Sequence, residues 1–202
     1  MLYAPRDQYA IDEQWVEIYN PMSASIDLSN YKLGDEENRG GTEAMMRFPI
    51  GSWIGPGQAV VVASKATYFY DKFHFLPDYE IADSMLEVPD LLPYVSWSGG
   101  SFVLYAESDE VILLDPNDAL ADVVTFGESL HPACQPAVPG VLPGHSIERR
   151  PADQDTNSNA DWIDQANPNP GSVYMTSDPM LLRAKVVFDH QDDLPKKTCE
   201  GF

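Results

Sequence analysis

Short runs of alternating or β-branched apolar residues recur along the chain, and turn-forming residues separate them. An apolar residue at every second position places the apolar side chains on one face of an extended strand. Several short strands at regular spacing, divided by turn signals, are typical of β-sandwiches. The pattern therefore predicts an all-β sandwich. The predicted strands are residues 14–20, 45–50, 58–64, 101–107, 110–115, 120–127 and 145–151.

Two short links join three of these runs. Only Ser108 and Asp109 separate residues 101–107 from 110–115, and the sequence PNDA separates 110–115 from 120–127. Short links rich in turn-forming residues connect antiparallel neighbours. We expect these three strands to form an antiparallel meander.

The first run has two distinguishable faces. Val16 and Ile18 fall on one face, and Trp15, Glu17 and Tyr19 fall on the other, because strand side chains alternate. The charged Glu17 indicates that the second face contacts solvent.

Residues 64–73 depart from the strand pattern. Their apolar positions recur at helical spacing, at Ala66, Phe69, Tyr70 and Phe73, and Ser64 stands where an N-cap is expected. We predict one short helix that covers an end of the sandwich.

Two long connections, residues 74–100 and 128–144, exceed the usual loop length in a compact domain. The first carries an apolar set that either folds back over the core or forms an exposed binding patch. That set is Phe75, Tyr79, Leu91, Leu92, Tyr94 and Trp97. From it, the predicted partner-binding residues are Tyr79, Leu92, Tyr94 and Trp97.

Charge narrows the range of partners. The 202 residues include 32 acidic and 12 basic side chains, for a net charge of −20, which repels nucleic acid and anionic lipid. The longest apolar runs are far shorter than the ~20 residues that span a bilayer. We therefore expect a protein or a cell-surface polymer as partner, with no nucleic acid and no membrane insertion.

Reactive side chains form no recognisable catalytic motif. The serine-hydrolase elbow, the zinc-protease helix motif and the phosphate-binding loop are missing from the sequence. His145 and Ser146 are adjacent on a predicted strand, so they point to opposite faces and cannot act as base and nucleophile. We expect a non-enzyme without cofactors. The alternative is a secreted hydrolase that uses carboxylates of residues 74–100.

Cysteine and arginine are used sparingly. Cys134 and Cys199 are the two cysteines, in no metal-binding spacing, and the sequence leaves open whether they pair. Arg149 and Arg150 lie on a predicted strand, where one side chain faces inward. A buried guanidinium needs carboxylate or carbonyl partners, so we expect a structural ion pair.

The segment 153–164 has oxygen-bearing side chains at every second position. These are Asp153, Asp155, Asn157, Asn159 and Asp161, and Asp164 would take the twelfth position of a calcium loop. However, Ser158 stands where such a loop needs glycine, and Asp164 is shorter than the usual glutamate. Asn and Asp also bond to backbone two residues ahead, which builds turns without an ion. We predict self-bonded turns anchored by Trp162, with calcium as the alternative.

Four segments, in order, resemble the lamin tail domain family. They are "EQWVEIYNPMSASIDLSNYKLGDEE" (13–37), "FPIGSWIGPGQAVVVAS" (48–64), residues 99–127, and "GHSIERRPADQDTNSNADWIDQANPNPG" (144–171). The chain departs from the family pattern in the 74–100 insertion, and Asn30 and Tyr31 stand where glycine and tryptophan are more common.

This resemblance implies an immunoglobulin-like β-sandwich, here with one short helix and long loops. It also implies a binding or tethering module without chemistry of its own, of the kind found in secreted or surface proteins of bacteria and archaea. We expect an N-terminal extension (1–12), the domain (13–174), and a tail or the start of a following segment (175–202). No export signal is visible in the first residues, so we expect a fragment of a larger extracellular or cell-surface protein with a linked neighbouring domain.

Overall fold

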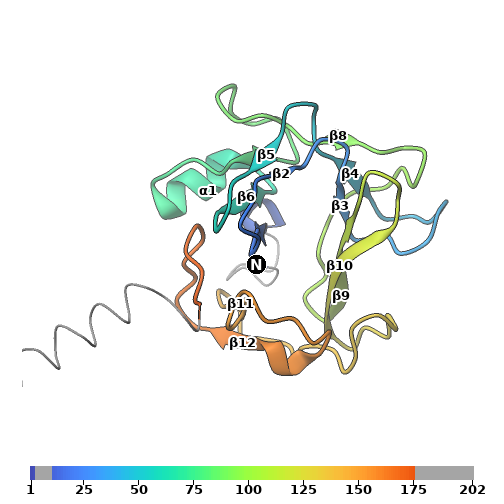
Figure 1. Ribbon diagram of the computed structural model, residues 1–202, viewed down its shortest axis with the longest axis vertical. Coiled ribbons are helices and arrows are strands. Elements are labelled where there is room, and N and C mark those ends of the chain that lie inside the picture. The colour runs from blue at the N-terminus through green and yellow to red at the C-terminus, as the bar shows by residue number, and fades with distance from the viewer. Residues whose placement is uncertain (3–10, 176–202) are drawn as a thin grey trace, which may run out of the picture.

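Two β-sheets face each other across the main core, and two short ribbons complete the structure (Figure 1). The computed structural model describes residues 1–2 and 11–175. One sheet has the strand order β1-β6-β7, and the other has the order β10-β9-β3-β4-β8. The pairs β2-β5 and β11-β12 form the ribbons. The strands are β1 (Trp15–Tyr19), β2 (Ile26–Asp27), β3 (Lys32–Gly34), β4 (Met45–Arg47), β5 (Trp53–Ile54), β6 (Ala59–Ala63), β7 (Tyr79–Glu80), β8 (Leu92–Pro93), β9 (Ser108–Leu114), β10 (Leu120–Gly127), β11 (Ser146–Arg149) and β12 (Trp162–Gln165).

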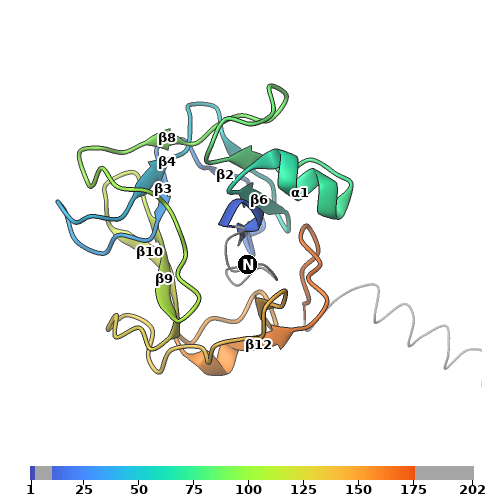
Figure 2. The same cartoon turned by 180° about the vertical axis from the view of Figure 1, so that it is seen from behind.

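The one α-helix, among the residues that the structure describes, is α1 (Ala66–Phe73). Two single 3-10 turns accompany it, η1 (Ile11–Glu13) and η2 (Asn159–Asp161). The prediction of a nearly all-β sandwich with one short helix is confirmed. Figure 2, seen from behind, shows α1 and the β9-β10 hairpin on opposite sides of the molecule.

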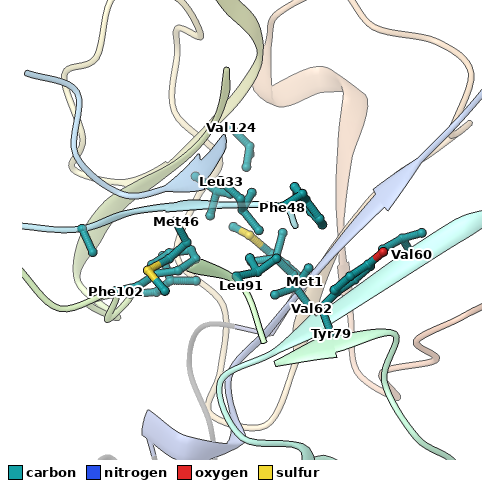
Figure 3. Close-up of a cluster of buried hydrophobic side chains, with 14 of the residues drawn as sticks. Met1, Leu33, Met46, Phe48, Val60, Val62, Tyr79, Leu91, Phe102 and Val124 are labelled. Carbon is teal, nitrogen blue, oxygen red and sulfur yellow. The ribbon is translucent and has the colours of Figure 1, made fainter. Parts of the chain in front are cut away.

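The main core fills the space between the two sheets. Figure 3 shows side chains from several strands meeting there, among them Leu33, Phe48, Val62 and Val124. Each of these four side chains is buried. Burial of apolar surface at this interface is the principal force that holds the sheets together.

A second cluster lies on the other face of β1, beneath α1. Trp15 packs there against Val61 and Phe69, and the Trp15 and Phe69 ring centroids lie 6.5 Å apart, edge to face. The expectation that this face of β1 contacts solvent is therefore wrong. The helix covers it, and Glu17 is half-buried.

The N-terminal residues belong to this packing as well. Leu2 pairs with Trp15 through two backbone hydrogen bonds, and the side chains of Met1 and Leu2 are buried. Residues 1–2 are thus part of the core, rather than of the extension expected for 1–12. The interval 3–10 lies outside the described residues.

Helix α1 starts differently from the prediction. Lys65 occupies the N-cap position, without a side-chain cap, and Ser64 lies one residue earlier. The Glu80 carboxylate instead accepts the Ala66 N–H at 2.8 Å. A buried acid from β7 therefore satisfies a donor at the positive end of the helix.

The predicted meander forms only in part. Strands β9 and β10 pair as an antiparallel hairpin, as expected, but residues 101–107 contribute only an isolated bridge at Ser101. Ser108 and Asp109, expected as a turn, are the first residues of β9.

Side chains take the place of a neighbouring strand along residues 103–105. Asp35 Oδ2 accepts the Val103 N–H at 2.9 Å, and Asp109 Oδ2 accepts the Tyr105 N–H at 2.7 Å. The Gln14 side chain bonds both backbone groups of Leu104, at 2.6 and 3.1 Å. These three side chains satisfy polar groups that a strand ladder would otherwise satisfy.

Candidate functional site

The four residues predicted to bind a partner do not form one surface. Tyr79 is only 9% exposed, and its ring packs edge to face on Phe48 at 5.1 Å. Leu92 lies on the edge strand β8 and is 40% exposed. From the wider apolar set, Leu91 is buried and Phe75 is 40% exposed. Of the two alternatives for this set, folding back over the core holds for Tyr79 and Leu91, because β7 carries Tyr79 into the core. Partner binding by the four residues stays a prediction.

Tyr94 and Trp97 cover the outer face of the five-stranded sheet, where they pack on the buried cluster that includes Met45 and Ile112. The Tyr94 hydroxyl donates to Asp118 at 3.0 Å, and Asp118 pairs with the buried Lys32 at 2.6 Å. Arg39 stacks over the Trp97 ring and also pairs with Asp118. In these contacts the rings of Tyr94 and Trp97 have a structural role, because they cover the sheet. Whether either also meets a partner stays a prediction.

The insertion 74–100 is organised around one buried acid. Besides the Ala66 N–H, the Glu80 carboxylate accepts hydrogen bonds from Ser84 N (3.0 Å), Ser84 Oγ and Met85 N (2.9 Å). Although burial opposes ionisation, these bonds hold the Glu80 pKa below its usual value. Asp83 and Asp90 bring further carboxylate oxygens within 4.8 Å of Glu80. Both carboxylate oxygens of Glu80 already accept hydrogen bonds from the protein, so Glu80 has a structural role.

The 153–164 segment bonds to itself. Asp161 accepts hydrogen bonds from Thr156 N (2.7 Å) and Thr156 Oγ1 (2.8 Å), and the Ser158 side chain and Asp161 form a reciprocal cap on η2. Asp155 accepts the Asn157 N–H at 2.9 Å. The predicted self-bonded turns are confirmed. The calcium alternative is a separate question for experiment.

The predicted structural ion pair is formed by Arg149. Its guanidinium donates to both oxygens of Asp122, each at 3.0 Å, and lies 4.9 Å from the centre of the Trp162 ring. Both contacts favour the charged form, and the Arg149 pKa is raised despite the opposing effect of burial. Trp162 packs against the main core, as expected for the anchor of this region.

Other reactive side chains are occupied or dispersed. His145 Nδ1 lies 2.7 Å from Asp164 Oδ1, while Ser146 is buried and points to the opposite face. Cys134 is a buried free thiol, and Cys199 lies outside the described residues.

A cavity of about 390 Å³ opens between β1 and the β11-β12 ribbon. This volume lies within the range of small-molecule and side-chain pockets. Val16 and Ile18 from β1, Leu113 from β9, Val124 from β10 and Trp162 from β12 contribute apolar walls. Residues 172 and 173 also line the cavity.

Acidic side chains surround these apolar walls. Five carboxylates line the cavity: Glu17, Asp122, Glu148, Asp153 and Asp155. The basic groups there are the Arg149 guanidinium, which Asp122 neutralises, and the buried Met1 amino group, which donates to the Ile147 carbonyl. Burial raises the Glu17 pKa above its usual value, and the charge of Glu148 adds to this shift. The Tyr19 pKa is raised by burial and by Asp153. The cavity therefore favours an occupant that is apolar in part and positively charged in part.

Sequence reasoning missed this cavity for a definable reason. In the sequence, Glu17 indicates a solvent-facing strand face, and Glu148 gives no signal of its own beside Arg149 and Arg150. Both acids come together only because β11 lies across from β1, 131 positions later in the chain, counted from Glu17 to Glu148. The large excess of acidic residues is the one sequence feature that indicates a cluster of carboxylates.

A family model described as Lamin Tail Domain matches residues 2–128. The chain belongs to the lamin tail domain family. This is a family of non-catalytic, immunoglobulin-like domains, in agreement with the resemblance seen in the sequence. The match ends at residue 128, so it does not extend to the segment 144–171 that also resembled the family.

The lamin tail fold also has a solved structural neighbour. A protein of the DUF4876 family from Bacteroides thetaiotaomicron VPI-5482 aligns with a TM-score of 0.59 and 13% identity, over 88% of this chain and 73% of that chain. Identity this low supports a shared fold alone. A search of curated proteins found no match. Among the described residues, no helix is long and apolar enough to cross a bilayer.

Proposed function

We propose that this lamin tail domain is a non-catalytic binding or tethering module of a larger secreted or cell-surface protein. It keeps a neighbouring domain in position by binding a protein or a cell-surface polymer. The observation that carries the proposal is the cavity between β1 and β11-β12, which presents apolar walls within an acidic rim. A site of this kind is suited to recognition, because the apolar contacts supply affinity and the charges select the partner.

The arrangement of the acids supports binding over hydrolysis. Arg149 and Asp122 pair with each other, and Glu17 accepts the Gly171 N–H. In the 74–100 insertion, Glu80 is committed to four donors. A carboxylate-based hydrolase needs an acid and a base that are both available to substrate.

A pair of matched variants tests the binding role. Ala121 is exposed and lines the cavity, whereas Ala82 is exposed and lies outside the cavity lining. Ala121→Trp should obstruct the cavity, and Ala82→Trp should add the same surface elsewhere. The purified proteins are used to recover partners from the envelope and the medium of the source cells.

We expect a partner that wild type and Ala82→Trp recover and Ala121→Trp loses. Equal recovery by all three proteins would remove the cavity from the proposed function. Turnover of a generic esterase, phosphatase or glycosidase substrate by the pure chain would overturn the non-catalytic assignment itself.

A further inference from the structure

Residues 101–106, which we call the strap, lie against the main core between two anchored ends. At one end the Gly100 N–H donates to the Glu43 carbonyl at 3.1 Å, and at the other the Glu107 carbonyl accepts the Glu128 N–H at 3.3 Å. Glycine permits the close approach at the first end, because a Cβ there would lie 1.9 Å from a backbone carbonyl oxygen. Backbone contacts therefore anchor both ends of the strap.

Side chains hold the middle of the strap instead. Asp35 accepts the Val103 N–H at 2.9 Å, and Asp109 of β9 accepts the Tyr105 N–H at 2.7 Å. The neutral Gln14 side chain bonds both backbone groups of the residue between them. Two of the three side chains that hold this part of the backbone can therefore change their charge with pH.

The strap covers part of the main core with alternate side chains. Phe102 and Leu104 point inward, are 8% and 4% exposed, and belong to the buried cluster between the sheets. Val103 is half-buried and Tyr105 is exposed. Detachment of the middle of the strap would place the two inward side chains in water. Their hydrophobic contacts therefore oppose opening, and a second force has to act against them.

The two acids that hold the strap lie where negative charge is unfavourable. Asp35 is fully buried, and Asp109 is 5% exposed. Burial raises the pKa of Asp35 to about 7 and that of Asp109 to about 8, and the two N–H donors of each acid only partly offset this effect. Glu43, just before β4, raises the pKa of both acids, and Asp35 raises the pKa of Asp109. Further carboxylates act on Glu43 in turn: Glu36, Glu37 and Glu110.

We propose that the strap is a pH-controlled closure, which covers the main core in a mildly acidic medium and detaches in its middle as the medium becomes alkaline. Ionised Asp35 and Asp109 repel each other and Glu43, and detachment allows water to solvate their carboxylates. The open state binds fewer protons than the closed state, so a rise in pH favours opening. This inference goes beyond the proposed function, because neither of the two acids lines the cavity between β1 and β11-β12.

Hydrogen exchange of the full chain, followed by mass spectrometry of its peptides, measures this opening. The protection of a peptide that covers residues 101–107 is compared at about pH 6 and about pH 8.5, relative to the intrinsic exchange rate at each pH. We expect protection to fall at least about tenfold over this interval. The reason is that a pKa difference of one unit between the closed and open states, at one acid, already changes the opening equilibrium about tenfold.

Dilute urea distinguishes opening of the strap from unfolding of the whole domain. Opening of a short segment exposes little surface and depends weakly on urea, whereas global unfolding depends on urea steeply. At the alkaline pH we expect the exchange rate of the 101–107 peptide to be independent of urea. The exchange rate of a peptide from the β9-β10 hairpin should increase with urea.

Matched substitutions assign the opening to the two acids. In the Asp35→Asn, Asp109→Asn double variant, the protection of the strap should differ by less than about twofold between the two pH values, because amides do not ionise. Asp109→Asn alone should show a smaller fall than wild type, which serves if the double variant does not fold. Glu107→Gln, at an exposed acid beside the strap, is the control and should retain the fall seen in wild type.

Three results would overturn the proposal. Unchanged protection of the wild-type 101–107 peptide between the two pH values would show that the strap stays closed. Equal urea dependence in the strap and the hairpin would show that the strap opens only when the whole domain unfolds. Equal reduction of the pH effect by Glu107→Gln and by Asp109→Asn would assign the effect to total charge. None of these results affects partner recovery with Ala121→Trp, so the proposed function is tested separately.

Discussion

Two groups of buried carboxylates in this domain respond to burial in opposite ways. Glu80 is fully buried, yet its pKa lies below the usual value, whereas burial raises the pKa of Asp35 to about 7 and that of Asp109 to about 8. Desolvation opposes ionisation in every case. Glu80 has four donors for its two oxygens, while Asp35 and Asp109 each have two and also repel one another.

The difference shows how one acidic chain uses carboxylates for two purposes. Glu80 is held as an anion that joins α1 to the 74–100 insertion. Asp35 and Asp109 hold residues 103 and 105 but remain sensitive to the pH of the medium. The balance between desolvation, which raises the pKa, and the hydrogen-bond donors around a buried acid, which lower it, decides which behaviour results.

The largest expected effect comes from removing Glu80. Glu80→Ala leaves the N–H groups of Ala66, Ser84 and Met85 without their acceptor, and an unsatisfied buried donor is strongly unfavourable. We expect a loss of about 4 kcal/mol in the free energy of unfolding, measured by urea denaturation. Asp83→Ala, a neighbouring exposed acid, should lose less than about 1 kcal/mol. A small loss for Glu80→Ala would show that water replaces the carboxylate.

The next effect is a dependence of stability on pH. An unfolded aspartate loses its proton near pH 4, whereas folded Asp35 and Asp109 retain theirs to about 7 and about 8. Between these values the unfolded state binds fewer protons, so stability is greatest near pH 4 and falls as the pH rises to about 8. We expect the free energy of unfolding to fall by several kcal/mol between pH 5 and pH 9, measured by urea denaturation at each pH.

Single substitutions assign this pH dependence. Asp35→Asn and Asp109→Asn should each flatten the curve of unfolding free energy against pH, because the amide does not ionise. Glu128→Gln, on an exposed loop, should leave the slope unchanged. Identical slopes in all four proteins would assign the dependence to the overall negative charge instead.

A smaller effect is expected at the Arg149 ion pair. Arg149→Lys keeps the charge but loses the two parallel bonds to Asp122 and the stacking on Trp162. We expect a loss of about 2 kcal/mol in unfolding free energy. Arg150→Lys changes a more exposed pair with Glu148 and should lose less than about 1 kcal/mol. Equal losses would mean that the bidentate geometry adds nothing.

Calcium is expected to have the smallest effect. The Asp155 and Asp161 side chains already accept hydrogen bonds within their own loop, so the melting temperature should differ by less than about one degree between chelator and millimolar calcium. A rise of several degrees that Asp155→Ala abolishes would identify the 153–164 loop as a calcium site. A rise abolished by Asp83→Asn would place the ion beside Glu80 and Asp90.

Features governed by local pattern were predictable from the sequence. The periodicity of residues 64–73 located α1, the alternating residues 14–20 located β1, and the β-branched run within 58–64 located β6. The Asn and Asp spacing after Asp153 located the self-bonded turns, and the paired arginines predicted the Arg149 ion pair. In each case the relevant partners are close in sequence, or the residue type alone demands one.

Features governed by distant partners were not predictable. Residues 101–107 have the composition of a strand, but acceptors from Gln14, Asp35 and Asp109 take their backbone groups. The apolar residue Tyr79 looks the same in the sequence whether it covers the core or lies exposed. Residues 1–2 pair with β1 and with β11, and no local pattern in the sequence predicts this pairing.

The side-chain tethers of residues 103–105 have a consequence for the order in which the chain folds. Gln14 and Leu104 are 90 positions apart, and Asp35 and Val103 are 68 apart, so neither contact can form until distant parts of the chain have met. Closing such long loops carries an entropic penalty that local hairpins avoid. The β9-β10 hairpin should therefore form early, and the amide hydrogens of Val103 and Leu104, which donate to Asp35 and Gln14, should be among the last to gain protection in pulsed hydrogen exchange during refolding.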